Sequence, residues 1–71
     1  MMKYLVVIEK TKSGYSAFSP DLPGCVATGK TKRQVEKRMQ AAVSFHLEGF
    51  RLERQRFPKP HSYSTYLASP A

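Results

Sequence analysis

Hydrophobic and polar positions divide this chain of 71 residues into three short alternating segments, one long helical segment and an irregular end. The first segment, residues 4–9, is rich in β-branched and aromatic residues, which favours a strand. Its alternate positions are apolar on both faces, so we expect a strand that is covered on both sides. One face carries Tyr4, Val6 and Ile8, and the other carries Leu5 and Val7.

Two further strands follow from the turn residues between them. Residues 10–14 are polar and end in glycine, which is typical of a hairpin loop, and residues 15–19 then alternate as a second strand. In the sequence PDLPG of residues 20–24, the two prolines preset the backbone and Pro-Gly favours a type II turn. A short third strand over residues 25–28 completes an antiparallel meander.

A long helix is predicted after this meander. Thr31 can cap its first turn, and Gln34 stands three residues later, where a capping box needs it. We expect the helix to pass through Gly49 and to end near residue 53, because an internal glycine costs only about 1 kcal/mol. One face carries apolar positions at helical spacing, namely Val35, Met39, Ala42, Val43, His46, Leu47 and Phe50.

The end of the chain completes the predicted fold. The prolines of residues 57–60 favour a stiff extended segment, residues 62–67 alternate as a fourth, terminal strand, and residues 68–71 form a loose tail. Residues 1–71 then form a single α+β domain in the order β-β-β-α-β, with a small, mainly antiparallel sheet and one long helix on one face. The other face, with Leu5 and Val7, is left uncovered, which predicts a homo-oligomer, a dimer or a tetramer.

The charge balance changes the expected partners. Twelve Lys and Arg against five Asp and Glu give a net charge of +7, which favours an anionic partner. Five of the cations cluster at the start of the helix, where the helix dipole disfavours them. Either this cluster contacts nucleic acid or an acidic partner, or it is an ordinary solvated face. Its members are Lys30, Lys32, Arg33, Lys37 and Arg38.

Candidate chemistry is sparse, and we predict no catalytic, cofactor or metal site. Asp21 is interpreted as a turn residue that accepts backbone hydrogen bonds, and Cys25 as a small buried apolar residue. His46 lies within the apolar helix face and is interpreted as a core histidine, and His61 belongs to no motif. A single cysteine permits no disulfide within the chain.

The expected location is the cytoplasm. The apolar run near the start is too short for a signal peptide or a membrane span, and an unpaired cysteine suits a reducing compartment.

Together, these residues resemble a family. The sequence YSAFSPDLPGCVATGKT of residues 15–31, a helix containing Ala41-Ala42 and residues 46–48, and the FPKP of residues 57–60 are similar to HicB-like antitoxin domains. The similarity runs from Tyr4 to about Ser62.

This resemblance implies a truncated ribonuclease H fold and a non-enzymatic antitoxin. Such a protein forms oligomers and neutralises a small, HicA-like toxin that cleaves messenger RNA. Many members add a C-terminal DNA-binding domain, which we do not expect within these residues. Lys30 stands where the family usually has an acidic residue. The alternative hypothesis is therefore a small basic nucleic-acid-binding protein that uses the start of the helix.

Overall fold

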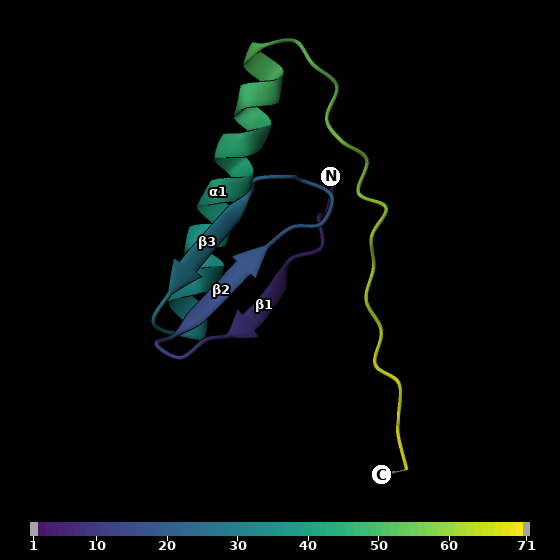
Figure 1. Ribbon diagram of the computed structural model, residues 1–71. Coiled ribbons are helices and arrows are strands. Elements are labelled where there is room, and N and C mark those ends of the chain that lie inside the picture. Colours follow the sequence, from purple (N-terminus) through teal and green to yellow (C-terminus); the bar gives the residue numbers. More distant parts are fainter. Residues whose placement is uncertain (1, 71) are drawn as a thin grey trace.

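The computed structural model describes residues 2–70 and shows a three-stranded sheet with one helix against it (Figure 1). The strands β1 (Val7–Lys10), β2 (Tyr15–Phe18) and β3 (Val26–Gly29) are antiparallel and lie in the order β1-β2-β3. The helix α1 (Lys32–Leu52) packs on one face. The predicted α+β class, the antiparallel meander and the single long helix are confirmed.

Strand register decides which side chains meet the helix. Ile8 lies opposite Ala17, which lies opposite Ala27, and this row faces α1. The neighbouring positions on each strand point to the other side of the sheet, because side chains alternate along a strand. Val7, Phe18 and Val26 therefore form a row on the face away from α1.

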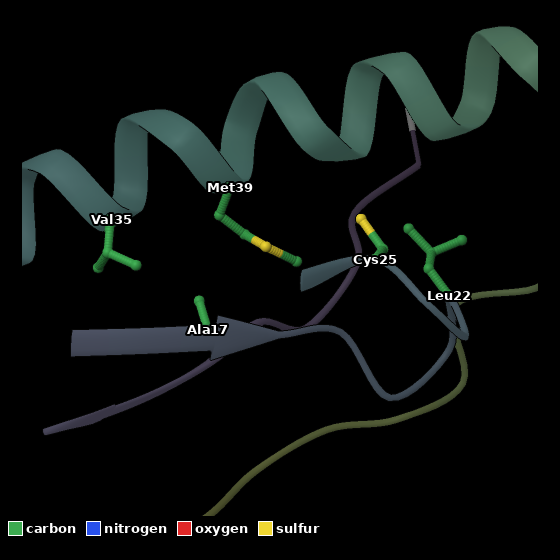
Figure 2. Close-up of a cluster of buried hydrophobic side chains, with 5 residues drawn as sticks. All are labelled: Ala17, Leu22, Cys25, Val35 and Met39. Atoms are coloured by element: carbon green, nitrogen blue, oxygen red, sulfur yellow. The ribbon is translucent and has the colours of Figure 1, made fainter. Parts of the chain in front are cut away.

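The buried core is small and sits between β2, the loop after it and α1. Leu22 from the loop and Val35 from the helix are fully buried, and Met39 is 1% exposed. Figure 2 shows Met39 reaching from α1 toward Ala17 and Cys25, with Leu22 closing one end of the cluster. The complete cluster is Ala17, Leu22, Cys25, Val35 and Met39.

Two consecutive turns build the loop that supplies Leu22 and Cys25. The backbone N–H of Leu22 donates to the carbonyl oxygen of Ser19 at 3.1 Å, and that of Cys25 donates to Leu22 at 3.0 Å. The second turn has Pro23 at its first central position and Gly24, with a φ of 82°, at its second. A positive φ there defines the type II turn that Pro-Gly predicts.

The first strand is shorter than predicted, because residues 4–6 have no strand opposite them. β2 ends at Phe18, which pairs with Val7. The next residue, Ser19, uses its backbone N–H to bond Cys25 and its hydroxyl to bond the carbonyl oxygen of Leu5 at 2.8 Å. The chain therefore turns away before the ladder can reach Tyr4.

Both ends of α1 are capped by local hydrogen bonds. The Thr31 hydroxyl accepts the backbone N–H of Gln34 at 3.0 Å, and the Gln34 side chain accepts the N–H of Lys30 at 2.6 Å. This is a capping box in which the Gln34 side chain bonds the N–H of Lys30 instead of that of the cap residue, Thr31. The helix passes Gly49, as predicted, and the next turn is closed by Arg54, which adopts a positive φ of 55°.

The predicted fourth strand is wrong, because residues 62–67 have no regular secondary structure. Alternation of polar and aromatic residues favours a strand only where a sheet face receives the aromatic side chains. Tyr63 is 87% exposed and Tyr66 is fully exposed, so neither is packed on the sheet. Residues 68–70 of the predicted tail are also irregular and exposed, and Ala71 lies outside the described residues.

Asp21 instead ties the segment after the helix to the rest of the fold. Its carboxylate accepts the backbone N–H groups of His61, at 3.1 Å, and Ser62, at 2.9 Å, and the Ser62 hydroxyl at 2.8 Å. Three residues before His61, the carbonyl oxygen of Pro58 accepts a hydrogen bond from the Tyr4 hydroxyl. Asp21 does accept backbone hydrogen bonds, but from a segment 40 residues away rather than from its own turn.

These bonds lower the pKa of Asp21. The largest contribution is the N–H of Ser62, and the Ser62 hydroxyl and His61 add to it. A carboxyl group whose pKa is lower in the folded than in the unfolded state stabilises the fold at pH values above the unfolded-state pKa. This stabilisation is lost as the pH falls through the folded-state pKa.

Two glycines allow a matched test of the helix–sheet contact. A Cβ atom on Gly29 would lie 2.7 Å from the backbone nitrogen of Val35, whereas one on Gly49 meets nothing within 4 Å. We expect Gly29→Ala to lower the free energy of unfolding by about 1–3 kcal/mol. Gly49→Ala should raise it by about 0.5–1 kcal/mol, because alanine favours the helix. Urea denaturation followed by circular dichroism measures both, and equal effects would contradict the close packing at Gly29.

The Asp21 anchor predicts an acid-dependent difference between variants. Asp21→Asn should be less stable than the wild type at pH 7, and the difference should shrink as the pH falls below about 4, the ordinary carboxyl pKa. Urea denaturation at a series of pH values between 7 and 2 tests this. Glu9→Gln, at an exposed position of β1, is the control and should stay parallel to the wild type. A difference between Asp21→Asn and the wild type that does not change with pH would exclude the anchor.

Candidate protein-interaction surface

The sheet face away from α1 carries a continuous apolar row. Val7, Phe18 and Val26 stand side by side across the three strands, and Phe18 and Val26 are 40% and 64% exposed. Leu5 is half-buried on the chain just before β1. In Figure 1 the helix lies only on the other side of the sheet. We call the four residues Leu5, Val7, Phe18 and Val26 the open sheet face.

Sequence reasoning found half of this surface. Leu5 and Val7 were predicted because their strand is apolar on both sides. Phe18 and Val26 were missed, although Phe18 alternates visibly with Ala17 in the sequence. Their juxtaposition with Val7 depends on register, which follows from the lengths of the two turns.

The second exposed apolar region lies on the end of α1 that extends beyond the sheet (Figure 1). Phe45 is 83% exposed and Leu52 is 68% exposed. They stand seven residues apart, so they share one side of the helix. Single exposed apolar residues are common. Aromatic side chains, phenylalanine among them, are however enriched in protein–protein interfaces relative to the rest of the surface.

His46 lies on this projecting half and not in the core, which corrects the prediction. Its ring packs edge-on against Phe50, with the ring centroids 5.5 Å apart. It is half-buried and lies outside the buried cluster. The apolar face of α1 is longer than the sheet that covers it, so periodicity alone placed His46 too deep.

A groove of about 580 Å³ runs between α1 and the chain leading into β1. Its walls carry apolar side chains from both elements, including Tyr4, Val6, Val43 and Leu47. Burial, and to a smaller extent the nearby Asp21 carboxylate, raise the pKa of Tyr4. The phenol therefore keeps its proton and remains a donor to Pro58.

The predicted basic cluster is exposed throughout. Arg38 donates from its guanidinium to the carbonyl oxygen of Thr28 at 3.0 Å, and so covers part of the free edge of β3. No acidic residue stands in the first turn of the helix to balance Lys32 and Arg33. The other members, Lys30 and Lys37, are also on the surface.

Three further titratable side chains among residues 2–70 depart from their ordinary pKa values, and the environment of each explains the shift. Cys25 is 3% exposed, and burial raises its pKa, which disfavours the thiolate that a nucleophile needs. Arg51 lowers the pKa of Glu48 in an exposed ion pair on α1, a contact that contributes little to stability. Within residues 2–70, no three His, Cys, Asp or Glu side chains gather to form a metal site. In the same range, no helix is long and apolar enough to span a membrane.

Comparison with known proteins identifies relatives over most of the chain. An uncharacterised 14.9 kDa protein of Haemophilus phage HP1 is 35% identical over 69 residues, which are 97% of this chain and 52% of that protein. The chain thus spans about half the length of this relative. A UPF0150 protein of Thermoplasma acidophilum is 32% identical over 62 residues, which are 86% of this chain and 90% of that protein.

A solved structure and a family model agree with each other. A chain of a HicA3 and HicB3 toxin-antitoxin complex superimposes with a TM-score of 0.70 and 30% identity, covering 84% of this chain and 70% of that one. The model of the HicB-like antitoxins of bacterial toxin-antitoxin systems matches residues 4–71. The chain therefore belongs to the HicB-like antitoxin family.

Proposed function

We propose that this protein binds a small messenger-RNA-cleaving toxin of the HicA kind and holds it inactive, without an enzymatic activity of its own. The observation that carries the proposal is the similarity to a chain of the HicA3 and HicB3 complex over 84% of this protein. The family match over residues 4–71 supports the same function.

We further propose that two apolar surfaces divide the contacts. The open sheet face pairs two copies, because a row of apolar side chains across a sheet is stable when a second sheet covers it. The projecting end of α1 is left for the toxin. A protein that acts on RNA carries a basic surface, so the cations at the start of α1 would repel it.

Phe45 is the anchor that this arrangement favours. It is 83% exposed, and Glu48 stands one turn further along the same helix. Aromatic side chains that insert into a partner's pocket commonly supply a large part of the binding free energy.

Pairing through the open sheet face predicts the effect of one added charge. Val26→Glu should weaken self-association at least tenfold, because it would bury a carboxylate between two sheets. Gln40→Glu adds the same charge on the exposed side of α1 and should leave association unchanged. Sedimentation equilibrium measures both. A wild-type protein that stays monomeric at about 100 μM would rule out this pairing.

Toxin neutralisation is tested by co-expression. The toxin to co-express is a small protein of the HicA kind, and growth inhibition is the measurement. We expect the wild type to restore growth. We also expect Phe45→Ala to weaken binding of the purified toxin at least tenfold, whereas Ser44→Ala, at the neighbouring exposed position, should have little effect.

Each arm of that experiment has its own contrary result. If co-expression of the wild type leaves the toxicity unchanged, the antitoxin function is excluded. If Phe45→Ala neutralises as well as Ser44→Ala, the function stands but the projecting end of α1 is not the toxin surface.

A further inference from the structure

Two loops that are distant in the sequence touch at one end of the sheet. A Cβ atom on Gly14, in the loop between β1 and β2, would lie 2.3 Å from the carbonyl oxygen of Gly29 and 3.0 Å from the Cα of Lys30. The absence of a side chain at Gly14 therefore lets this loop rest on the turn that enters α1. Figure 1 shows both loops at the same end of the molecule, opposite the C-terminal end of the helix.

This contact adds two lysines to the predicted basic cluster. Lys10 ends β1 and Lys12 lies in the hairpin loop, and both are exposed. Lys10 and Lys32 line one hollow together, with Glu36 as the carboxylate beside them. Seven of the twelve Lys and Arg thus gather here. We call them the basic end: Lys10, Lys12, Lys30, Lys32, Arg33, Lys37 and Arg38.

Between the two loops lies a hollow that is lined by hydrogen-bond donors. Thr11 and Ser13 contribute hydroxyl groups from the hairpin loop, and Tyr15 contributes its phenol. Lys30 and Arg38 contribute cations from the other side. Ammonium and guanidinium groups can only donate hydrogen bonds, and hydroxyl groups can also donate, so the hollow suits a ligand rich in acceptor oxygens.

The electrostatic arrangement selects for negative charge. The N-terminus of α1 is the positive end of the helix dipole, and its first turn carries cations instead of the acidic residues that would stabilise it. Within the isolated protein this is unfavourable. An anionic ligand would offset both the dipole and the mutual repulsion of the lysines.

We propose that the basic end binds the phosphodiester backbone of a nucleic acid, without reading its sequence. α1 is packed along the sheet, and the basic end consists of short loops and the first turns of that helix. Such a surface reaches phosphate oxygens but presents no helix or strand to a groove, and contacts to phosphate carry no base specificity. This site is separate from both apolar surfaces assigned above to protein contacts.

The test compares two charge reversals of equal size. Lys12→Glu with Lys32→Glu changes both loops of the basic end, whereas Arg56→Glu with Lys59→Glu changes exposed cations after the helix. Both double variants carry the same net charge, and circular dichroism verifies that each is folded. Fluorescence anisotropy measures binding to a labelled 20-nucleotide RNA and a 20-base-pair DNA duplex at 50 and 200 mM NaCl.

About four phosphate contacts would make wild-type binding fall roughly 50-fold on the RNA and roughly 150-fold on the duplex between these salt concentrations. The basic-end variant should bind at least tenfold more weakly at 50 mM NaCl, with a shallower salt dependence. The control should stay within about threefold of the wild type. The tighter of the two probes identifies the nucleic acid that the site prefers.

Two outcomes would overturn the proposal. Equal losses in the two variants would show that net charge alone drives binding, and the lack of any binding at 50 mM NaCl would exclude the site. Neither measurement involves a toxin, so a failure here leaves the antitoxin function untouched, and a failure of neutralisation leaves this site untouched.

Discussion

The contact between one helix and one face of a three-stranded sheet is the constraint on which this molecule depends. Val35 and Met39 of α1 meet Ala17 of β2, and the loop after β2 folds back so that Leu22 and Cys25 close the cluster. A single helix covers a single face, so a core of this kind leaves the other side of the sheet without a cover. The exposed apolar row on that side is a direct consequence.

The same constraint separates the surfaces of the molecule. α1 is longer than the sheet, so its far end projects with Phe45 and Leu52 exposed. The turn that enters its near end packs against the hairpin loop, where the cations gather. The open sheet face, the projecting helix end and the basic end therefore point in different directions. The second copy, the toxin and the nucleic acid that we propose as partners would therefore contact different places on the surface.

Polar contacts add what the small core cannot supply. The buried carboxylate of Asp21 holds residues 61 and 62, and Tyr4 holds Pro58, so the chain after α1 is fastened to the loop after β2 and to the segment before β1. The Asp21 carboxylate accepts three hydrogen bonds from residues 61 and 62, and these bonds favour its charged form. Without residues 61 and 62, the buried carboxylate of Asp21 would lose these three hydrogen bonds. The loop that carries Asp21 and the segment after α1 therefore stabilise each other.

The sequence by itself determined the features that local interactions decide. The Pro-Gly turn and the capping box at Thr31 each depend on residues within a few positions of one another, and both were predicted. The length of α1 was predicted from the apolar periodicity along consecutive residues. Half of the open sheet face, Leu5 and Val7, could also be inferred from strand alternation. The family resemblance depends on the same local motifs.

Only the tertiary structure decided the contacts between segments far apart in the chain. The fourth strand was predicted from alternation over residues 62–67, but a strand requires a neighbour to pair with, and alternation cannot supply one. His46 was placed in the core because helical periodicity does not show where the sheet ends. The partners of Asp21 lie 40 residues away, and the contact of Gly14 with Gly29 spans 15 positions. Bringing such distant residues together costs conformational entropy. The contacts that offset this cost involve groups that become neighbours only when the chain is folded, so the local sequence does not reveal them.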